Sequence, residues 1–453
     1  MASTVHRSVK LVLATDLEDT SWLAYVLEEF RIIQNASFEI MISRLEHTSS
    51  ELPTIYYHAS STTSPKHCIP NRSSVYSKTL ISVDNHIFIF KDTQSEDPGL
   101  LINYDILWNS FLFISRYWEY KTELSGKLIN SYFNNHPLHD TWPVQVPIVN
   151  IYFNILQSLI QNTFPELNFG QSKTPQIELS HDLDYIDKTV QLRIKQSAFH
   201  AYNALKSLPH IGRFFGNVRK LTRFLFTTPG YWNFDYWQNT EDRYRKTSVF
   251  YVFVRTNGRT LKQWLLDPSY DIRTNTSLVK TLKGLKAKGW EIGLHGSFAS
   301  ARDTQLLKEE KQTLEKALGC NIEKTRQHWL QYFETVTPDT HQQLFQFDST
   351  LGWNDHPGFR SGICSRYRPY DFKNKRRYNY WVTPQVLMDS HLYDYADNTE
   401  NRLAAAKEML KSLKGYSNSY VSISWHPRTA SPDYGWNRSY EELLQFCAHE
   451  DLL

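Results

Sequence analysis

The chain is poor in cysteine and contains no long apolar run. Its four cysteines, Cys68, Cys320, Cys364 and Cys447, are scattered without any paired spacing. This pattern predicts neither a zinc ribbon nor a disulfide framework, and it fits a reducing cytoplasm. No stretch approaches the ~20 apolar residues that a membrane-spanning helix needs. The apolar run at residues 11–14 is too short for a secretory signal, so we expect a soluble protein or one bound to a membrane surface.

The chain also lacks a strong overall charge. Its 50 Lys and Arg residues nearly balance 47 Asp and Glu residues, which gives a net charge of +3 and predicts no general preference for nucleic acid. The 453 residues, 41% of them hydrophobic, suffice for two domains with sizeable cores. Aromatic residues are plentiful, with 27 Tyr, 25 Phe and 13 Trp. Aromatic faces suit carbohydrate rings, although we expect most of these rings in the core.

One segment has no acidic residue at all. Between Lys188 and Phe234 there are eight basic residues and several interleaved phenylalanines and tyrosines. The basic residues are Lys188, Arg193, Lys195, Lys206, Arg213, Arg219, Lys220 and Arg223. Two interpretations stay open. The segment is either a helical insertion with a solvated basic face, or a platform for an anionic surface such as phospholipid headgroups or a phosphate-bearing glycan carrier.

Alternating strand and helix patterns divide the chain into two predicted domains. Over residues 1–170 we expect a smaller α/β domain, with strands at 9–13, 38–42, 54–57 and 87–90 and helices at 19–33, 105–120 and 148–160. A polar stretch with Gly170 and Pro175 marks the boundary. Over residues 171–453 we expect a parallel sheet, open or closed into a barrel. Its predicted strands are 177–180, 248–254, 291–294, 324–328, 344–348, 386–388 and 420–424, with helices such as 278–288 and 304–318 between them.

Acids, histidines and an arginine recur where the later strands end. Asp182 and Asp184 follow the first of these strands and point the same way, because side chains alternate along a strand. Two adjacent carboxylates call for a cation or an arginine between them. The later strands end near His295, Arg326, His328, Asp348 and His426. Since the carboxyl ends of parallel strands form one face, we expect these side chains to share a site.

The ordered motifs are similar to those of a known enzyme family. They read Ser-His-Asp-Leu-Asp (180–184), Glu-Ile-Gly-Leu-His-Gly-Ser (291–297), Arg-Gln-His (326–328), Asp-Ser-Thr-Leu-Gly (348–352), Gly-Phe-Arg-Ser-Gly-Ile-Cys (358–364) and Ser-Trp-His (424–426). Over about residues 175–450 the chain resembles the polysaccharide deacetylase family, the NodB-homology group related to carbohydrate esterase family 4. Residues 105–107 and 115–117 resemble the domain that precedes the deacetylase in a branch involved in surface-polysaccharide biosynthesis, such as that of O-antigen and lipopolysaccharide. The resemblance implies a distorted (β/α) barrel preceded by a smaller α/β domain.

The resemblance also implies catalytic roles. Asp182 matches the general base that takes a proton from the attacking water, and Arg326 matches the arginine that holds this base ionised. His426 matches the histidine that protonates the leaving amine. Asp348 is the first candidate for the acid that orients His426, and Asp389 is the second. Arg360, Trp425 and Trp329 are the candidates for substrate contacts.

The implied metal site departs from the family pattern at one position. Asp184 and His295 match ligands of a divalent metal, for which we expect Zn, with Ni, Co or Mn as alternatives. The family places a second histidine four residues after the first, and here that residue is Ala299. His328 could replace it, or water and Ser300 could fill the gap, or the metal is lost and the protein binds glycans without cleaving them. We favour a retained metal with His328 as the third ligand, although His328 could instead contact substrate.

Together these observations predict a metal-dependent N-deacetylase that acts on an N-acetylated amino sugar of a cell-surface glycan or its precursor. The lack of a signal segment favours a cytoplasmic location, either free or peripheral at the inner face of the membrane, and a sugar nucleotide or lipid-linked glycan as substrate. The segment 188–234 favours the lipid-linked form, and no nucleic-acid partner is expected. The alternatives are an inactive carbohydrate-binding or scaffold protein and an O-acyl esterase.

Overall fold

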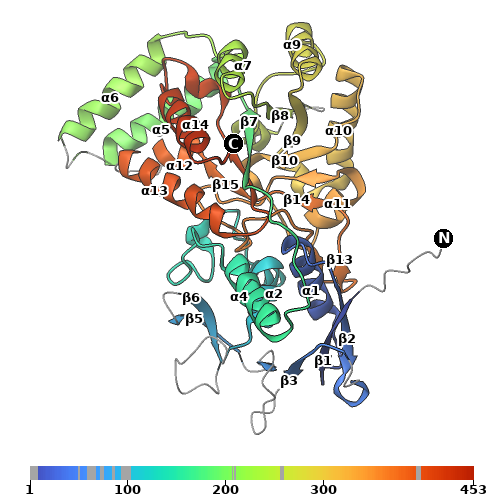
Figure 1. Cartoon of the computed structure of the whole chain (residues 1–453). Helices are drawn as coiled ribbons and strands as arrows, with labels where there is room; N and C mark the ends of the chain where they lie inside the picture. The colour runs from blue at the N-terminus through green and yellow to red at the C-terminus, as the bar shows by residue number, and fades with distance from the viewer. Residues whose placement is uncertain are drawn as a thin grey trace. The chain divides into compact units, whose positions relative to one another are not determined.

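The chain forms two compact units in a computed structural model, which describes residues 9–48, 52–58, 68–71, 76–83, 87–92, 104–206, 208, 211–255, 260–393 and 399–453 (Figure 1). The first unit comprises Met1–Gln176, Leu351–Val386 and Glu408–Val421. The second comprises Ile177–Thr350, Leu387–Lys407 and Ser422–Leu453. That a boundary between two independent domains lies near residue 170 stays a prediction. Among the described residues, every helix is too short or too polar to cross a membrane.

The first unit contains a small parallel sheet with helices. The strand order is β2-β1-β3-β4, and β1 pairs in parallel with both β2 and β3. An antiparallel hairpin, β5-β6, forms a separate two-stranded sheet. The strands are β1 (Lys10–Thr15), β2 (Glu39–Arg44), β3 (Thr54–His58), β4 (Cys68–Pro70), β5 (Tyr76–Val83) and β6 (Ile87–Asp92). The helices are α1 (Ser21–Ile33), α2 (Ile106–Ile114), α3 (Tyr117–Leu124) and α4 (Ile148–Thr163).

The helix predicted over residues 105–120 is two helices. Asp105 caps α2, because its carboxylate accepts a hydrogen bond from the backbone N–H of Trp108 at 2.8 Å. Arg116 has a φ of 55°, in the left-handed region, so the helix cannot continue through it. The sequence around residue 116 contains neither glycine nor proline and therefore did not predict this break.

An eight-stranded sheet with flanking helices forms the distorted (β/α) barrel, which confirms the predicted fold class. Its strand order is β14-β11-β10-β9-β8-β7-β16-β15, and the strands from β7 to β11 pair in parallel. The strands are β7 (Gln176–Leu183), β8 (Ser248–Phe253), β9 (Glu291–Gly296), β10 (Lys324–Gln327), β11 (Phe347–Asp348), β14 (Trp381–Val382), β15 (Gln385–Met388) and β16 (Tyr420–Ser424). A short antiparallel pair, β12 (Tyr370–Asp371) and β13 (Arg376–Arg377), belongs to the first unit.

Helices follow most strands of the second unit. They are α5 (Val190–Lys206), α6 (Ile211–Phe226), α7 (Phe234–Asp242), α8 (Leu261–Leu266), α9 (Thr276–Ala287), α10 (Thr304–Leu318), α11 (Thr337–Leu344), α12 (Asp389–Tyr393), α13 (Thr399–Lys411, which ends in the first unit) and α14 (Asn437–His449). The strand predicted at 344–348 is shorter, because residue 344 still belongs to α11.

The strand register brings the functional side chains to one edge of the sheet. Asp182 of β7 lies opposite Tyr251 of β8, and His295 of β9 lies opposite Arg326 of β10. Gly293 is required for this packing, because a Cβ atom there would lie 2.6 Å from the ring of Tyr251. The carboxyl ends of neighbouring strands therefore meet, as expected for a parallel sheet.

Candidate metal and catalytic site

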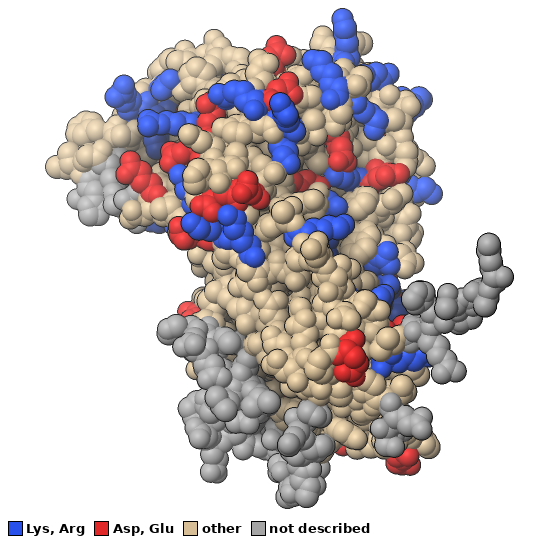
Figure 2. All heavy atoms as spheres, viewed as in Figure 1, with Lys and Arg blue, Asp and Glu red and all other residues tan. Residues whose placement is uncertain are grey.

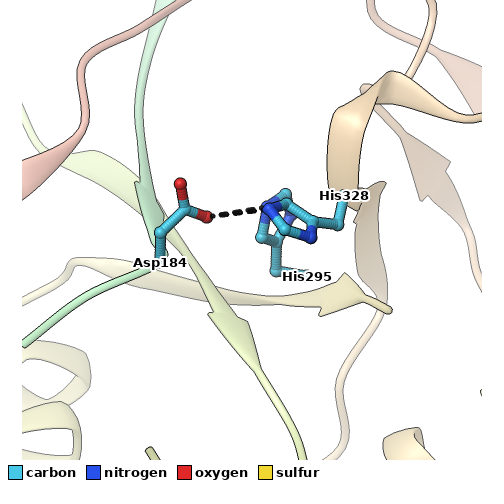
Figure 3. A group of neighbouring side chains, drawn as sticks. All are labelled: Asp184, His295 and His328. Carbon is cyan, nitrogen blue, oxygen red and sulfur yellow. Dashed lines mark ion pairs between the residues drawn. The ribbon is translucent and has the colours of Figure 1, made fainter. Parts of the chain in front are cut away.

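Three side chains at the ends of neighbouring strands converge on one point. Asp184 follows β7, His295 lies in β9 and His328 follows β10. The Asp184 Oδ1 atom lies 3.4 Å from His295 Nε2 and 3.6 Å from His328 Nε2, and the three atoms are all within 4.8 Å of one another. All three residues are buried. Figure 3 shows both imidazole rings beside the carboxylate of Asp184.

The hydrogen bonds of the two histidines decide which ring nitrogen carries the proton. His295 Nδ1 lies 2.9 Å from the carbonyl oxygen of Arg326, and His328 Nδ1 lies 3.2 Å from Oδ1 of Asp267. Both partners are acceptors, so each Nδ1 donates, and each neutral imidazole keeps its lone pair on Nε2. Two nitrogen lone pairs and a carboxylate oxygen therefore face each other.

This arrangement fits a divalent cation. Asp184 Oδ1 and His295 Nε2 are buried and make no hydrogen bond, which is costly unless another group satisfies them. Nitrogen and oxygen ligands lie about 2.0–2.2 Å from zinc, so two ligands of one tetrahedral ion lie about 3.4 Å apart. The separations of 3.4 and 3.6 Å match this value. Asp267 lies where an outer carboxylate would orient His328 as a ligand.

The loop after His295 is compatible with His328 as third ligand. Ala299 is half-buried and offers no ligand atom. The hydroxyl of Ser300, the alternative considered from the sequence, donates to the carbonyl oxygen of Ser297 at 2.9 Å and lies 3.2 Å from Gln327 Oε1. His328, whose Nε2 faces Asp184, therefore stays the candidate for the third ligand.

Asp182 is held ionised by a buried arginine. Its Oδ1 accepts from Arg326 Nη1 at 2.7 Å, and neither side chain is exposed by more than 4%. Arg326 is fixed in turn by Ser349, Ser422 and Ser424. Burial raises the pKa of Asp182, but the charge of Arg326 outweighs it, so the pKa lies below its ordinary value. A buried carboxylate that stays ionised is suited to accept a proton.

His426 lies on the other side of Asp184. Its Nε2 is 3.3 Å from Asp184 Oδ2, and its Nδ1 is 2.8 Å from Oδ1 of Asp389. Burial lowers the pKa of His426, but the carboxylate of Asp389 outweighs burial and raises it above the ordinary value. His426 is thereby favoured in its protonated form and can donate from Nε2.

The residue that orients His426 is Asp389. This corrects the sequence prediction, which gave that role first to Asp348. Asp348 instead accepts from the backbone N–H of Thr350 at 2.8 Å, and its Oδ2 lies 3.4 Å from His341 Nδ1. The reason is strand order: β15, which directly precedes Asp389, is the neighbour of β16, whereas β11 lies beyond β10.

Arg428 is a member of the site that the sequence motifs did not indicate. Its Nη1 donates to Asp184 Oδ2 at 2.7 Å. Burial raises the pKa of Asp184, but His426 and Arg428 outweigh burial and hold it well below its ordinary value. In the sequence, only the position of Arg428, two residues after His426 and in the same strand-end loop, indicated that it belongs to the site.

Two of the three predicted substrate contacts are corrected by the structure. Arg360 belongs to the first unit, is 2% exposed and forms a buried ion pair with Glu119 at 2.7 Å. Trp425 is fully buried, and its Nε1 donates to the carbonyl oxygen of Trp436. Trp329 is 37% exposed, and its ring centroid lies 5.8 Å from that of His328, so it stays a candidate.

Comparisons with known proteins identify relatives of parts of the chain. A family model described as a family of unknown function (DUF7033) matches residues 12–165, which lie within the first unit. No curated protein matches the chain. A candidate polysaccharide deacetylase from Mycobacterium smegmatis is 14% identical, with a TM-score of 0.37 over 63% of this chain and 87% of that one.

Two further solved structures are similar at the same low level. A polysaccharide deacetylase from Bacillus cereus is 9% identical, with a TM-score of 0.29 over 60% of this chain and 87% of that one. A candidate polysaccharide deacetylase involved in O-antigen biosynthesis, from Bordetella bronchiseptica, is 14% identical, with a TM-score of 0.23 over 55% of this chain and 71% of that one.

Proposed function

We propose that this protein is a metal-dependent deacetylase that hydrolyses the N-acetyl group of an amino sugar in a cell-surface glycan or its precursor. The observation that carries the proposal is the buried trio of Asp184, His295 and His328, in which Asp184 Oδ1 and His295 Nε2 make no hydrogen bond. A base, Asp182, and an acid, His426, flank it. The same set would be unneeded in a protein that only binds glycans.

Asp184, His295 and His328 would hold the ion. A divalent metal there would polarise the acyl carbonyl and make water a better nucleophile near neutral pH. Zinc fits a site with two imidazoles and one carboxylate, and Ni, Co and Mn are the alternatives.

The reaction needs two proton transfers that this chain's own residues can carry. Asp182, kept ionised by Arg326, accepts a proton as water adds to the amide carbon. His426, kept protonated by Asp389, donates from Nε2 to the departing nitrogen as the C–N bond breaks. Acetate and a free amine are the products.

A polar pocket of about 450 Å³ is a candidate for holding a carbohydrate. Tyr185, the residue after Asp184, lines it, whereas Asp184, His295 and His328 do not. Tyr270 borders it, and hydroxyl, amide and carboxylate groups complete its lining, including Thr189, Asp271 and Asn275. Such groups can match the hydroxyls of a sugar, while aromatic rings suit its apolar faces. We favour a lipid-linked glycan over a sugar nucleotide, and a place at the inner face of the membrane.

Acetate release from acetamido sugars tests the function. The purified protein should contain near-stoichiometric metal by mass spectrometry and release acetate together with a free amine. Asp182→Asn and Asp184→Asn should each lower the turnover number by at least ~100-fold, and only Asp184→Asn should lose metal.

The products and a control variant separate the alternatives. A free hydroxyl instead of a free amine would identify an O-acyl esterase. Glycan binding that a chelator leaves unchanged, with no acetate released, would contradict the proposal. His449→Ala, which removes a histidine whose side chain is 85% exposed, is the control for metal bound at the surface.

A further inference from the structure

The hairpin formed by α5 and α6 exposes an unusual number of large apolar side chains. On α5, Val190 is 71% exposed and Leu205 is 65% exposed, and Ile194 and Tyr202 between them are also exposed. Their spacing places the four residues along one side of the helix. Isolated exposed apolar residues need no explanation, but a continuous stripe indicates a surface that binds something.

The second helix of the hairpin repeats the pattern with basic residues beside it. On α6, Phe215 is 64% exposed and Phe226 is 84% exposed, and both lie on the side of the helix that also carries the exposed Ile211. Arg219 and Arg223 are exposed next to this stripe. The helix is therefore amphipathic, but its apolar stripe faces outward rather than into a core. Figure 1 shows α6 projecting on the left, away from the sheet of its unit.

The segment that forms the hairpin carries charge of one sign. Between residues 188 and 234 there is no acidic side chain. Lys188 forms an ion pair with Asp433 at 2.7 Å, and Lys195 donates to the hydroxyl of Tyr185. The exposed cations Arg219, Lys220 and Arg223 have no ion-pair partner in the described part of the chain. Figure 2 shows Lys and Arg side chains in blue at the upper left, with Asp and Glu side chains in red also in that region.

We propose that the α5–α6 hairpin docks on the surface of an anionic phospholipid bilayer. Helices that lie in the interface bury Phe and Leu side chains among the acyl chains and keep Lys and Arg at the headgroups, which is the composition found here. Anionic lipids attract such cations, whereas the apolar stripe alone would fit many partners. Because the helices of the described residues are too short or too polar to span a membrane, this contact is peripheral.

The docking surface lies beside the catalytic site. Gln191, in the first turn of α5, donates to the backbone oxygen of Asp267 at 2.9 Å, and Asp267 holds His328. On α8, Leu261 and Leu265 are exposed, and the carbonyl oxygen of the following residue accepts from Nε1 of Trp329. The first turn of α5, together with α8, therefore links the docking surface to the residues that contact His328.

Flotation with vesicles tests this proposal. The full chain should float with vesicles of equal parts phosphatidylcholine and phosphatidylglycerol, and should float poorly with phosphatidylcholine alone or at high salt. Each cation at such a surface favours binding about fivefold, so Arg219→Gln/Lys220→Gln/Arg223→Gln should bind about 100-fold more weakly. The matched control, Lys280→Gln/Lys283→Gln/Lys286→Gln, neutralises three exposed lysines of α9 and should bind like the wild type.

A second variant probes the apolar stripe. Phe215→Ser/Phe226→Ser changes only exposed side chains, so it should fold, as thermal melting can verify, and should also lose flotation. Equal flotation of all variants overturns the proposal. A second result would also overturn the proposal: the wild type shows no preference for anionic vesicles, and Phe215→Ser/Phe226→Ser changes the molecular mass in solution. The apolar stripe would then bind a second copy of the chain. Flotation requires no catalysis, so its failure would leave the proposed reaction unaffected.

Discussion

Removing His328 should weaken metal binding in a way that only a direct ligand can. His328 Nε2 lies 3.6 Å from Asp184 Oδ1, and its Nδ1 lies 3.2 Å from Asp267 Oδ1. Loss of an outer partner of a ligand usually costs about 10- to 100-fold in metal affinity. Asp267→Asn should therefore fall in that range. His328→Ala, which removes the ligand itself, should exceed ~100-fold, or about 3 kcal/mol.

Combining the two substitutions tests whether Asp267 acts on metal binding through His328. If Asp267 acts on a bound ion only through His328, Asp267→Asn should have no further effect once His328 is alanine. Zinc affinity can be measured by competition with a chromophoric chelator, with His449→Ala as the control. If His328→Ala binds zinc as tightly as the wild type, or if Asp267→Asn weakens binding equally in both backgrounds, the assignment of His328 is refuted.

Other predictions test the partner of His426, the stability of the folded chain and the binding of a metal ion. Asp389→Asn removes the charge that raises the pKa of His426, so the pH above which the turnover number falls should move lower, whereas Asp348→Asn should leave that profile unmoved. Burial raises the pKa of Glu310 from 4.5 to about 8. The folded chain therefore keeps a proton that the unfolded chain loses, and the free energy of unfolding should fall by at most ~1.4 kcal/mol per pH unit between these values. The free energy of unfolding, measured in urea at several pH values, should decline less steeply with pH in Glu310→Gln than in the wild type. Gly293→Ala should lower the free energy of unfolding by about 1–3 kcal/mol in the same assay, through a clash with a buried ring. Chelation should lower the melting temperature, and added zinc should restore it.

The strand-end motifs predicted much of the site because their chemistry is local. Asp182 and Asp184, spaced by two at the end of one strand, required only the alternation of a strand and the topology of a parallel sheet. His295, Arg326 and His426 followed from the same rule. The same alternation also argues against Trp425 as a substrate contact. Trp425 lies between Ser424, which contacts Arg326, and His426, so its side chain points to the opposite face, into the core.

Other features depended on contacts that a single sequence does not reveal. The partner of His426 required the order of the strands, which places Asp389 next to it and Asp348 elsewhere. Arg360 stands in a conspicuous motif, but it pairs with Glu119, which is 241 positions away. The role of Asp267 could not be predicted for the same reason, since it follows a short helix and belongs to none of the strand-end motifs.

The position of Arg428 has a consequence for the electrostatic potential of the site. Three acids of the candidate site lie beside a basic side chain: Asp182 with Arg326, Asp389 with His426, and Asp184 with Arg428 as well as His426. The remaining carboxylate, Asp267, contributes one negative charge behind His328. A divalent ion would leave the cavity with an excess of positive charge. Glycans that carry phosphate or carboxylate groups would be attracted to it, and the ammonium group of the product would be repelled, which favours release after each turnover.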